Sequence, residues 1–184
     1  MSKRIALLTA AAFGALALTA TIVAPVNAQE KTVMVGGAAM FPSRNIIQNA
    51  VNSKDHTTLV AAVKAAGLVD TLEGKGPFTV FAPTNAAFGK LPAGTVDNLV
   101  KPENKATLTK ILTYHVVPGK LEASDLSDGK KLKTVEGEEL TVKKANGKVM
   151  IVDAKGDTAT VTISNVNQSN GVIHVVDTVL MPAS

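Results

Sequence analysis

The chain has 184 residues, of which 46% are hydrophobic and 18% charged, and its formal net charge is +4. This composition excludes an intrinsically disordered polyelectrolyte and a low-complexity linker. Because the sequence contains no cysteine, disulfides, zinc–thiolate sites, thiol nucleophiles and iron–sulfur clusters are excluded as well.

Residues 1–28 have the pattern of a secretory signal peptide. A basic start precedes an uncharged apolar run over residues 5–23, and Val26-Asn27-Ala28 matches the small-x-small cleavage pattern. We expect cleavage after Ala28 and export to the periplasm or the exterior; an uncleaved membrane anchor is the alternative. The remaining 156 residues carry 17 basic and 15 acidic side chains, a net charge of +2. This charge does not indicate nucleic-acid binding, and the length fits one domain without a membrane span, expected to be a monomer.

The first half of the exported chain is predicted to be helical. After a polar, glycine-rich lead segment over residues 29–44, Leu59, Ala62 and Val63 repeat at helical spacing, with Asp55 ahead as a cap and Gly67 behind as a stop. A short β-branched and aromatic run at 78–82 predicts a buried strand, and Thr84 or Asn85 is placed to cap the helix after it. The predicted helices cover residues 46–51, 59–66, 86–90, 96–100 and 102–112.

From residue 131 onward the apolar period changes from 3.6 to 2, which predicts strands. Asn146-Gly147 is a strong signal for a two-residue hairpin turn, because both positions tolerate positive φ. Residues 172–176 have no polar face apart from His174, so we expect a central strand there. The predicted strands cover residues 131–135, 140–144, 148–152, 158–163 and 172–180.

Few residues offer catalytic or metal-binding chemistry. His56, His115 and His174 each stand alone, without a second histidine at ligand spacing. We expect His56 to be solvated in a polar turn, and His115 and His174 to be partly buried imidazoles bonded to backbone or hydroxyl groups. The sequence also has no nucleophile elbow, phosphate loop or dinucleotide fingerprint. It therefore predicts neither an enzyme nor a resident cofactor or metal.

Three segments in order resemble the motifs of the fasciclin domain family. Residues 79–88 (TVFAPTNAAF) are similar to its first signature, residues 112–117 (LTYHVV) to its tyrosine–histidine segment, and residues 170–182 (NGVIHVVDTVLMP) to its second signature. The resemblance covers residues 45–182. It implies an α+β domain whose helices pack on a wedge of two β-sheets, with the two signatures side by side in the sheet.

The resemblance also implies a noncatalytic function in cell adhesion or surface and matrix contact. Matrix members of the family contact integrins through the tyrosine–histidine region and an acidic Asp-Ile pair. The matching candidates for partner binding here are Tyr114, His115, Asn165 and Val166. Because Asn165 lacks the carboxylate, a metal-bridged receptor contact of that kind is not expected. The expected partners are cell-surface or matrix proteins or polysaccharides.

A small-ligand binder of the periplasm or exterior is the alternative function. Its ligand would occupy an apolar pocket between the helices and the sheet. Haem is one candidate ligand, because His115 and His174 could serve as axial ligands.

Overall fold

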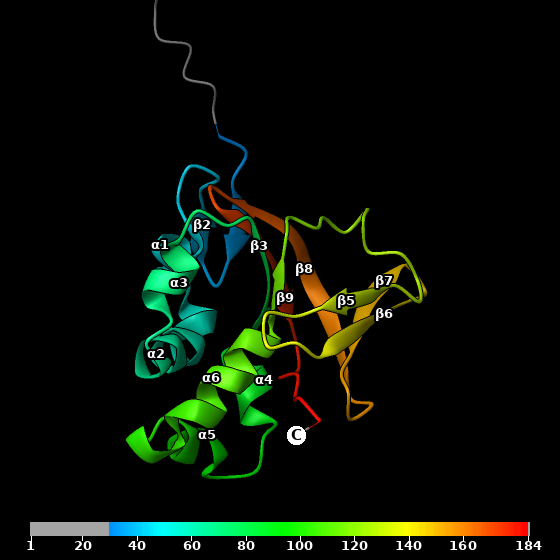
Figure 1. Ribbon diagram of the computed structural model, residues 1–184. Coiled ribbons are helices and arrows are strands. Elements are labelled where there is room, and N and C mark those ends of the chain that lie inside the picture. Colours follow the sequence, from blue (N-terminus) through cyan, green and yellow to red (C-terminus); the bar gives the residue numbers. More distant parts are fainter. Residues whose placement is uncertain (1–29, 184) are drawn as a thin grey trace, which may run out of the picture.

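The computed structural model describes residues 30–183 and places a layer of short helices against one half of a bent sheet (Figure 1). The predicted signal peptide lies outside the described residues. The helices are α1 (Ile46–Ala50), η1 (Lys54–His56), α2 (Thr57–Ala66), α3 (Val69–Glu73), α4 (Asn85–Gly89), α5 (Thr95–Leu99), η2 (Pro102–Asn104) and α6 (Lys105–Tyr114). The strands are β1 (Val33–Val35), β2 (Ala38–Met40), β3 (Phe78–Pro83), β4 (Val116–Pro118), β5 (Lys131–Lys133), β6 (Glu139–Ala145), β7 (Lys148–Val152), β8 (Thr158–Gln168) and β9 (Gly171–Val176).

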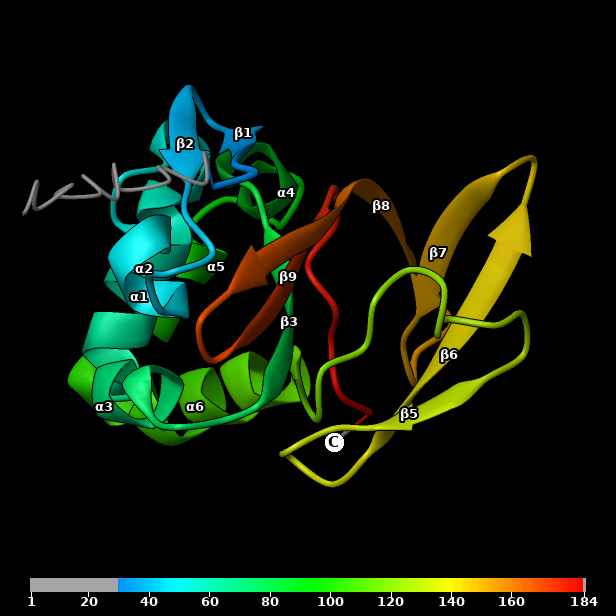
Figure 2. The same ribbon diagram turned by 90° about the horizontal axis from the view of Figure 1, so that it is seen from above.

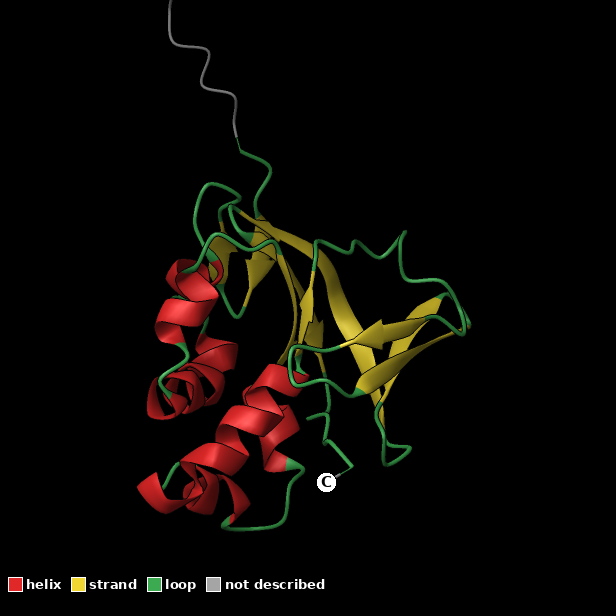
Figure 3. Cartoon of the chain, viewed as in Figure 1, coloured by secondary structure: helices red, strands yellow, loops and turns green. Residues whose placement is uncertain are grey.

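The main sheet has seven strands in the order β4-β3-β9-β8-β7-β6-β5. The long strand β8 belongs to both halves: its residues 158–160 pair with β7, and residues 161–168 pair with β9 with two register shifts along this second pairing. Its bend folds the sheet into the wedge that the family resemblance implies (Figure 3). The two edges of the bent sheet are joined by a hydrogen bond: the Val135 amide, just after β5, donates to the Val116 carbonyl of β4 (2.8 Å).

Strands β3 and β9 run parallel at the centre, so the two signature motifs lie side by side as expected. Their alternating side chains supply two separate cores. Val80 and Ile173 pack against the helices, whereas Phe81 and Val176 face the inside of the wedge. Figure 2 shows the same division, with the helices on one side of β3 and β9 and strands β5, β6 and β7 on the other.

Two helix caps follow the predicted turn chemistry, and one does not. Gly67 ends α2 in the left-handed conformation, and the Thr84 side chain accepts from the Ala87 amide at the start of α4. The expected cap of α2 by Asp55 is wrong. Asn85 from the neighbouring element accepts the Thr58 amide instead (3.0 Å).

The strand predictions are right in type and less accurate at the ends. Asn146 and Gly147 form the predicted two-residue turn between β6 and β7, both with positive φ. Strand β8 runs beyond residue 163 to Gln168, and β9 ends at Val176 rather than at 180. Further along, side chains rather than a neighbouring strand accept the Leu180 and Met181 amides. The β1–β2 hairpin was not predicted, although Val35 and Met40 are buried in the helix-side core.

A buried asparagine joins the helices to the β8–β9 turn. The Asn170 side chain accepts the first amide of α1 from Ile46 (3.1 Å) and donates to the Leu72 and Gly74 carbonyls at the end of α3. Next to it, a Cβ on Gly171 would overlap the Phe78 carbonyl oxygen. Only glycine therefore fits where β9 begins beside β3.

Residues 30–183 include no helix that has both the length and the apolar character needed to cross a membrane.

Replacing Phe81 with alanine should lower the free energy of unfolding by about 3–5 kcal/mol, because this ring is fully buried (0% exposed) and its loss leaves a cavity. The matched control is Met34→Ala: the Met34 side chain is 59% exposed, and surface changes cost less than about 0.5 kcal/mol. Urea unfolding of both variants measures the difference. Equal stability of Phe81→Ala and the wild type would contradict the assigned core.

Candidate functional site

Tyr114, the first candidate for partner binding, ends α6 with its side chain inside the wedge. It is fully buried. Its hydroxyl accepts from the Ala154 amide (2.9 Å) and donates to the Glu139 carbonyl (3.3 Å). Burial is the main reason that the pKa of Tyr114 rises to about 12. The phenol therefore stays neutral and connects α6 to β6 and to the β7–β8 turn.

His115 follows directly and is 2% exposed. Its Nδ1–H donates to the Ile111 carbonyl one turn back (2.8 Å), and its Nε2 accepts from the Leu180 amide (3.0 Å). Burial lowers the pKa of His115 to about 4, against smaller opposing effects of the Ile111 carbonyl and Asp153. The neutral imidazole therefore links the end of α6 to the C-terminal segment, and this confirms the buried bonding role expected for it.

The C-terminal segment over residues 177–183 forms no strand, yet side chains accept hydrogen bonds from three of its amides. The Leu180 amide donates to His115, the Met181 amide to the Asp153 carboxylate (2.9 Å), and the Ala183 amide to the Glu138 carboxylate (2.8 Å). The partners come from α6, the β7–β8 turn and the β5–β6 turn. These bonds hold the segment across the closing side of the wedge.

Asn165, the third candidate, lies at a bulge of β8 with a left-handed φ of 58°. Its side-chain oxygen accepts the Ala123 amide (2.7 Å), and its own amide points to Nδ1 of His174 (3.4 Å). Nε2 of His174 donates to the Leu121 carbonyl (2.7 Å). Asn165 and His174 thus hold the loop over residues 119–130, together with the Thr79 hydroxyl, which accepts the Leu121 amide. Val166 beside them is buried.

The four candidate residues do not form one surface. Tyr114 and His115 precede β4, and Asn165 and Val166 lie on β8, so that β3 and β9 separate the two pairs. Asn165 is half-buried and the other three side chains are buried. Partner binding by these residues stays a prediction, and three of the four could influence a partner only through the backbone and loops that they hold.

The expectation that His56 is solvated is wrong, because this side chain is buried (3% exposed). The β1–β2 hairpin covers it: the Lys54 amide donates to the Gly36 carbonyl (3.2 Å), which brings η1 under the hairpin turn. Nδ1 of His56 contacts the Ser53 hydroxyl at 2.9 Å, whereas Nε2 has no hydrogen bond of normal length among the described residues. Burial lowers the pKa of His56, although the Ala82 backbone and Asp55 act in the opposite direction.

An apolar cavity lies between the helical layer and the sheet. The volume within it that the centre of a water molecule can reach is about 70 Å³. Its walls are almost entirely apolar and come from β1, β2, α1, α2, α3, α6, β3, β4, β8 and β9, and Ser53 and His56 also line it. An arrangement of this kind suits an uncharged apolar group and cannot stabilise a charge.

The geometry does not support haem ligation. Both ring nitrogens of His115 and both of His174 already take part in bonds to backbone groups, so neither imidazole offers a free nitrogen to iron. Within the described part of the chain, no group of three or more His, Asp or Glu side chains lies close enough together to hold a metal ion.

Stability should fall in acid because of His115. Its pKa is about 4 in the folded chain and 6.5 in the unfolded chain, so below pH 6.5 the unfolded state takes up a proton that the folded state excludes. The free energy of unfolding should therefore decrease between about pH 6.5 and pH 4, by about 3 kcal/mol in total. His56 and His174 act in the same direction.

The variant His115→Ala tests this assignment. At pH 7.5 it should lose about 1–3 kcal/mol, because the Leu180 amide is left without its acceptor. It should also lose less stability than the wild type on going to pH 5, and urea unfolding at both pH values measures this. Parallel pH profiles for the two proteins would show that His115 is not the titrating group.

Comparison with known proteins identifies the family. The family model of the fasciclin domain matches residues 54–182. The protein sll1483 of Synechocystis sp. is 48% identical over 181 residues, which are 98% of this chain and 97% of the relative. The cell surface glycolipoprotein MPB83 of Mycobacterium bovis is 40% identical over 153 residues, 80% of this chain and 64% of the relative.

Solved structures that share the fold include a FAS1 domain pair from the insect cell adhesion molecule Fasciclin I. The TM-score is 0.68 at 20% identity, and the match covers 77% of this chain and 52% of the other, about half of the pair. The sequence motifs, the wedge-shaped sheet and these matches lead to one conclusion: the chain belongs to the fasciclin domain family.

Proposed function

We propose that this chain is an exported, noncatalytic surface-interaction module of the adhesion type. The observation that carries the proposal is its place in the fasciclin family, with relatives that include a protein named as a cell surface glycolipoprotein. Export through a cleaved signal peptide ending at Ala28 is part of the proposal.

The hydrogen bonding of the signature residues also supports a noncatalytic role. Tyr114, His115 and His174 have altered pKa values, and in an enzyme such groups are candidates for acid–base chemistry. Here each is buried and bonded to backbone groups that it positions. The polar atoms of these side chains therefore hold loops and the C-terminal segment in place by hydrogen bonds.

A deletion strain of the source organism tests the function. It should attach to surfaces or aggregate less than the parent strain, and re-expression of the chain should restore the behaviour. Re-expression of His115→Ala should restore it only in proportion to the folded fraction, because His115 supports the fold from the inside. Normal attachment and aggregation of the deletion strain under several growth conditions would contradict the proposal.

Binding of a small apolar ligand is a second candidate function, favoured by the cavity between the helices and the sheet. A neutral fluorescent probe, N-phenyl-1-naphthylamine, should bind there with increased emission. Ala50→Leu adds three carbon atoms to the cavity wall and should weaken binding about tenfold or more, since the space is small. Val51→Leu changes the exposed neighbour and serves as control. Equal binding by both variants, or none by the wild type, would argue against a ligand site.

A further inference from the structure

The outer face of strands β5, β6 and β7 carries a concentration of lysines. Along these strands Leu132, Leu140, Val142 and Ile151 point into the wedge and are buried. The residues between them point outward, and among these Lys131, Lys133, Lys143 and Lys148 are exposed. Figure 2 shows that these strands stand at the end of the molecule away from the helices.

The strand register places three of these lysines in a row. Lys131 lies opposite Thr141, Lys143 opposite Met150, and Lys148 opposite Ala145. Lys131 and Lys143 are therefore diagonal neighbours, and so are Lys143 and Lys148, a relation that separates residues by about 7–8 Å. The row crosses three strands, and Lys133 lies beside its first member.

Little negative charge opposes this row. Among the outward-facing residues of the three strands, all of which are described, Glu139 is the one acid, and it is paired with Lys131 (3.4 Å). Asp128, in the loop before β5, accepts the Lys144 amide, and Asp177, after β9, is paired with Lys90. The face thus holds four lysines and one glutamate, a charge of +3, whereas the chain after residue 28 carries +2 in all. The rest of that chain has a net charge of −1.

The chemistry of the face favours a sugar polymer over a membrane or a nucleic acid. Hydroxyl groups of Thr141, Thr158 and Thr160 lie between and beside the lysines and can bond sugar oxygens. None of the large exposed apolar side chains of the described residues (Met34, Val51, Val100 and Val135) lies on these three strands, and the outward-facing Met150 and Val152 are half-buried, so this face offers little apolar surface to insert into lipid. It also has no aromatic side chain on which bases could stack.

We propose that the lysine row across β5, β6 and β7 binds an acidic polysaccharide, with the ammonium groups contacting carboxylates spaced along the polymer. This inference rests on the proposed surface-interaction function and names its partner class. A linear polyanion satisfies several fixed, separate charges at once, and its attraction is the sum of several weak contacts.

Binding to polygalacturonate tests the proposal, with neutral dextran as the reference polymer. The wild type should bind polygalacturonate and not dextran, and binding should weaken as the ionic strength rises from about 0.05 M to about 0.5 M because exposed charges are screened. The triple variant Lys133→Gln, Lys143→Gln, Lys148→Gln keeps the Lys131–Glu139 pair. Its affinity for polygalacturonate should be at least about tenfold lower than that of the wild type.

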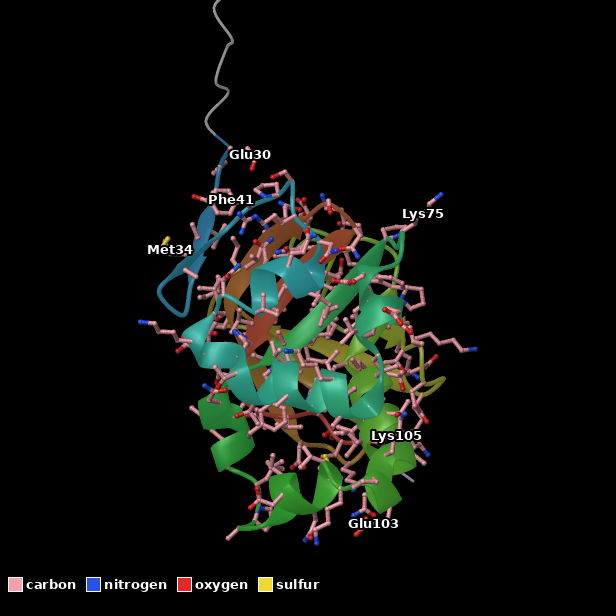
Figure 4. All side chains as sticks on the ribbon, turned by 90° about the vertical axis from the view of Figure 1, so that its left-hand side faces the viewer. Glu30, Met34, Phe41, Lys75, Glu103 and Lys105 are labelled. Atoms are coloured by element: carbon pink, nitrogen blue, oxygen red, sulfur yellow. The ribbon has the colours of Figure 1, made fainter. Side chains whose placement is uncertain are left out.

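A second triple variant controls for net charge. Lys75→Gln, Lys101→Gln, Lys105→Gln removes the same charge from exposed positions on the helical side, where Figure 4 labels Lys75 and Lys105. It should keep its affinity within about twofold of the wild type, since the helices lie on the other side of β3 and β9 from this face and exposed charges are screened over such a separation. Both triple variants should unfold at the same urea concentration as the wild type.

Three results would overturn the proposal: absence of polygalacturonate binding by the wild type, equal losses in the two triple variants, or preferential binding to phosphatidylglycerol vesicles. The test is separate from that of the general function. Suppose that a deletion strain loses attachment and regains it fully when the triple variant Lys133→Gln, Lys143→Gln, Lys148→Gln is expressed. In that case the surface function stands, and the lysine row is not the part of the chain that contacts the partner.

Discussion

The parallel pairing of β3 with β9 is the constraint on which the other contacts of this domain depend. The two strands are about 90 residues apart in the chain, and closing so long a loop costs conformational entropy that the pair must offset. It does so by burial on both faces, with Val80 and Ile173 toward the helices and Phe81 and Val176 toward the inside of the wedge. The Phe81 and His174 rings stack across the pair with centroids 5.7 Å apart. The close approach also explains the glycine at the start of β9.

The buried imidazoles of His115 and His174 attach segments without strand structure to this central pair. A neutral imidazole has one donor and one acceptor, so it can satisfy two backbone groups at once. His115 donates through Nδ1 and accepts through Nε2, whereas His174 donates through Nε2 and accepts through Nδ1. Each partner set fixes a different tautomer. Burial keeps both rings neutral by lowering their pKa values, and the same burial makes these bonds sensitive to acid.

Local rules predict much of the fold, and the remaining features depend on contacts between distant segments. Asn146-Gly147 specifies its turn, and the apolar residues of β9 indicate a central strand, because turn conformation and burial on both faces leave direct marks in the sequence. The burial of His56 leaves no such mark. It depends on the β1–β2 hairpin lying over η1, and strands of three residues are too short to show a period. The cap of α2 by Asn85 is equally nonlocal.

The residues that identify the family are buried, whereas the residues available to contact a partner are exposed. The motif residues Tyr114, His115 and His174 are buried and bonded to backbone, so a change at any of them acts first on the fold. Outward positions on β5, β6 and β7 join the sheet through their backbones, and their side chains, Lys131 and Glu139 being paired with each other, can change without disturbing the core. Relatives with 40–48% identity can therefore share the wedge and still present different charges on it. Partner specificity in this fold is best sought on exposed strand faces and loops, where the charge of this chain is concentrated.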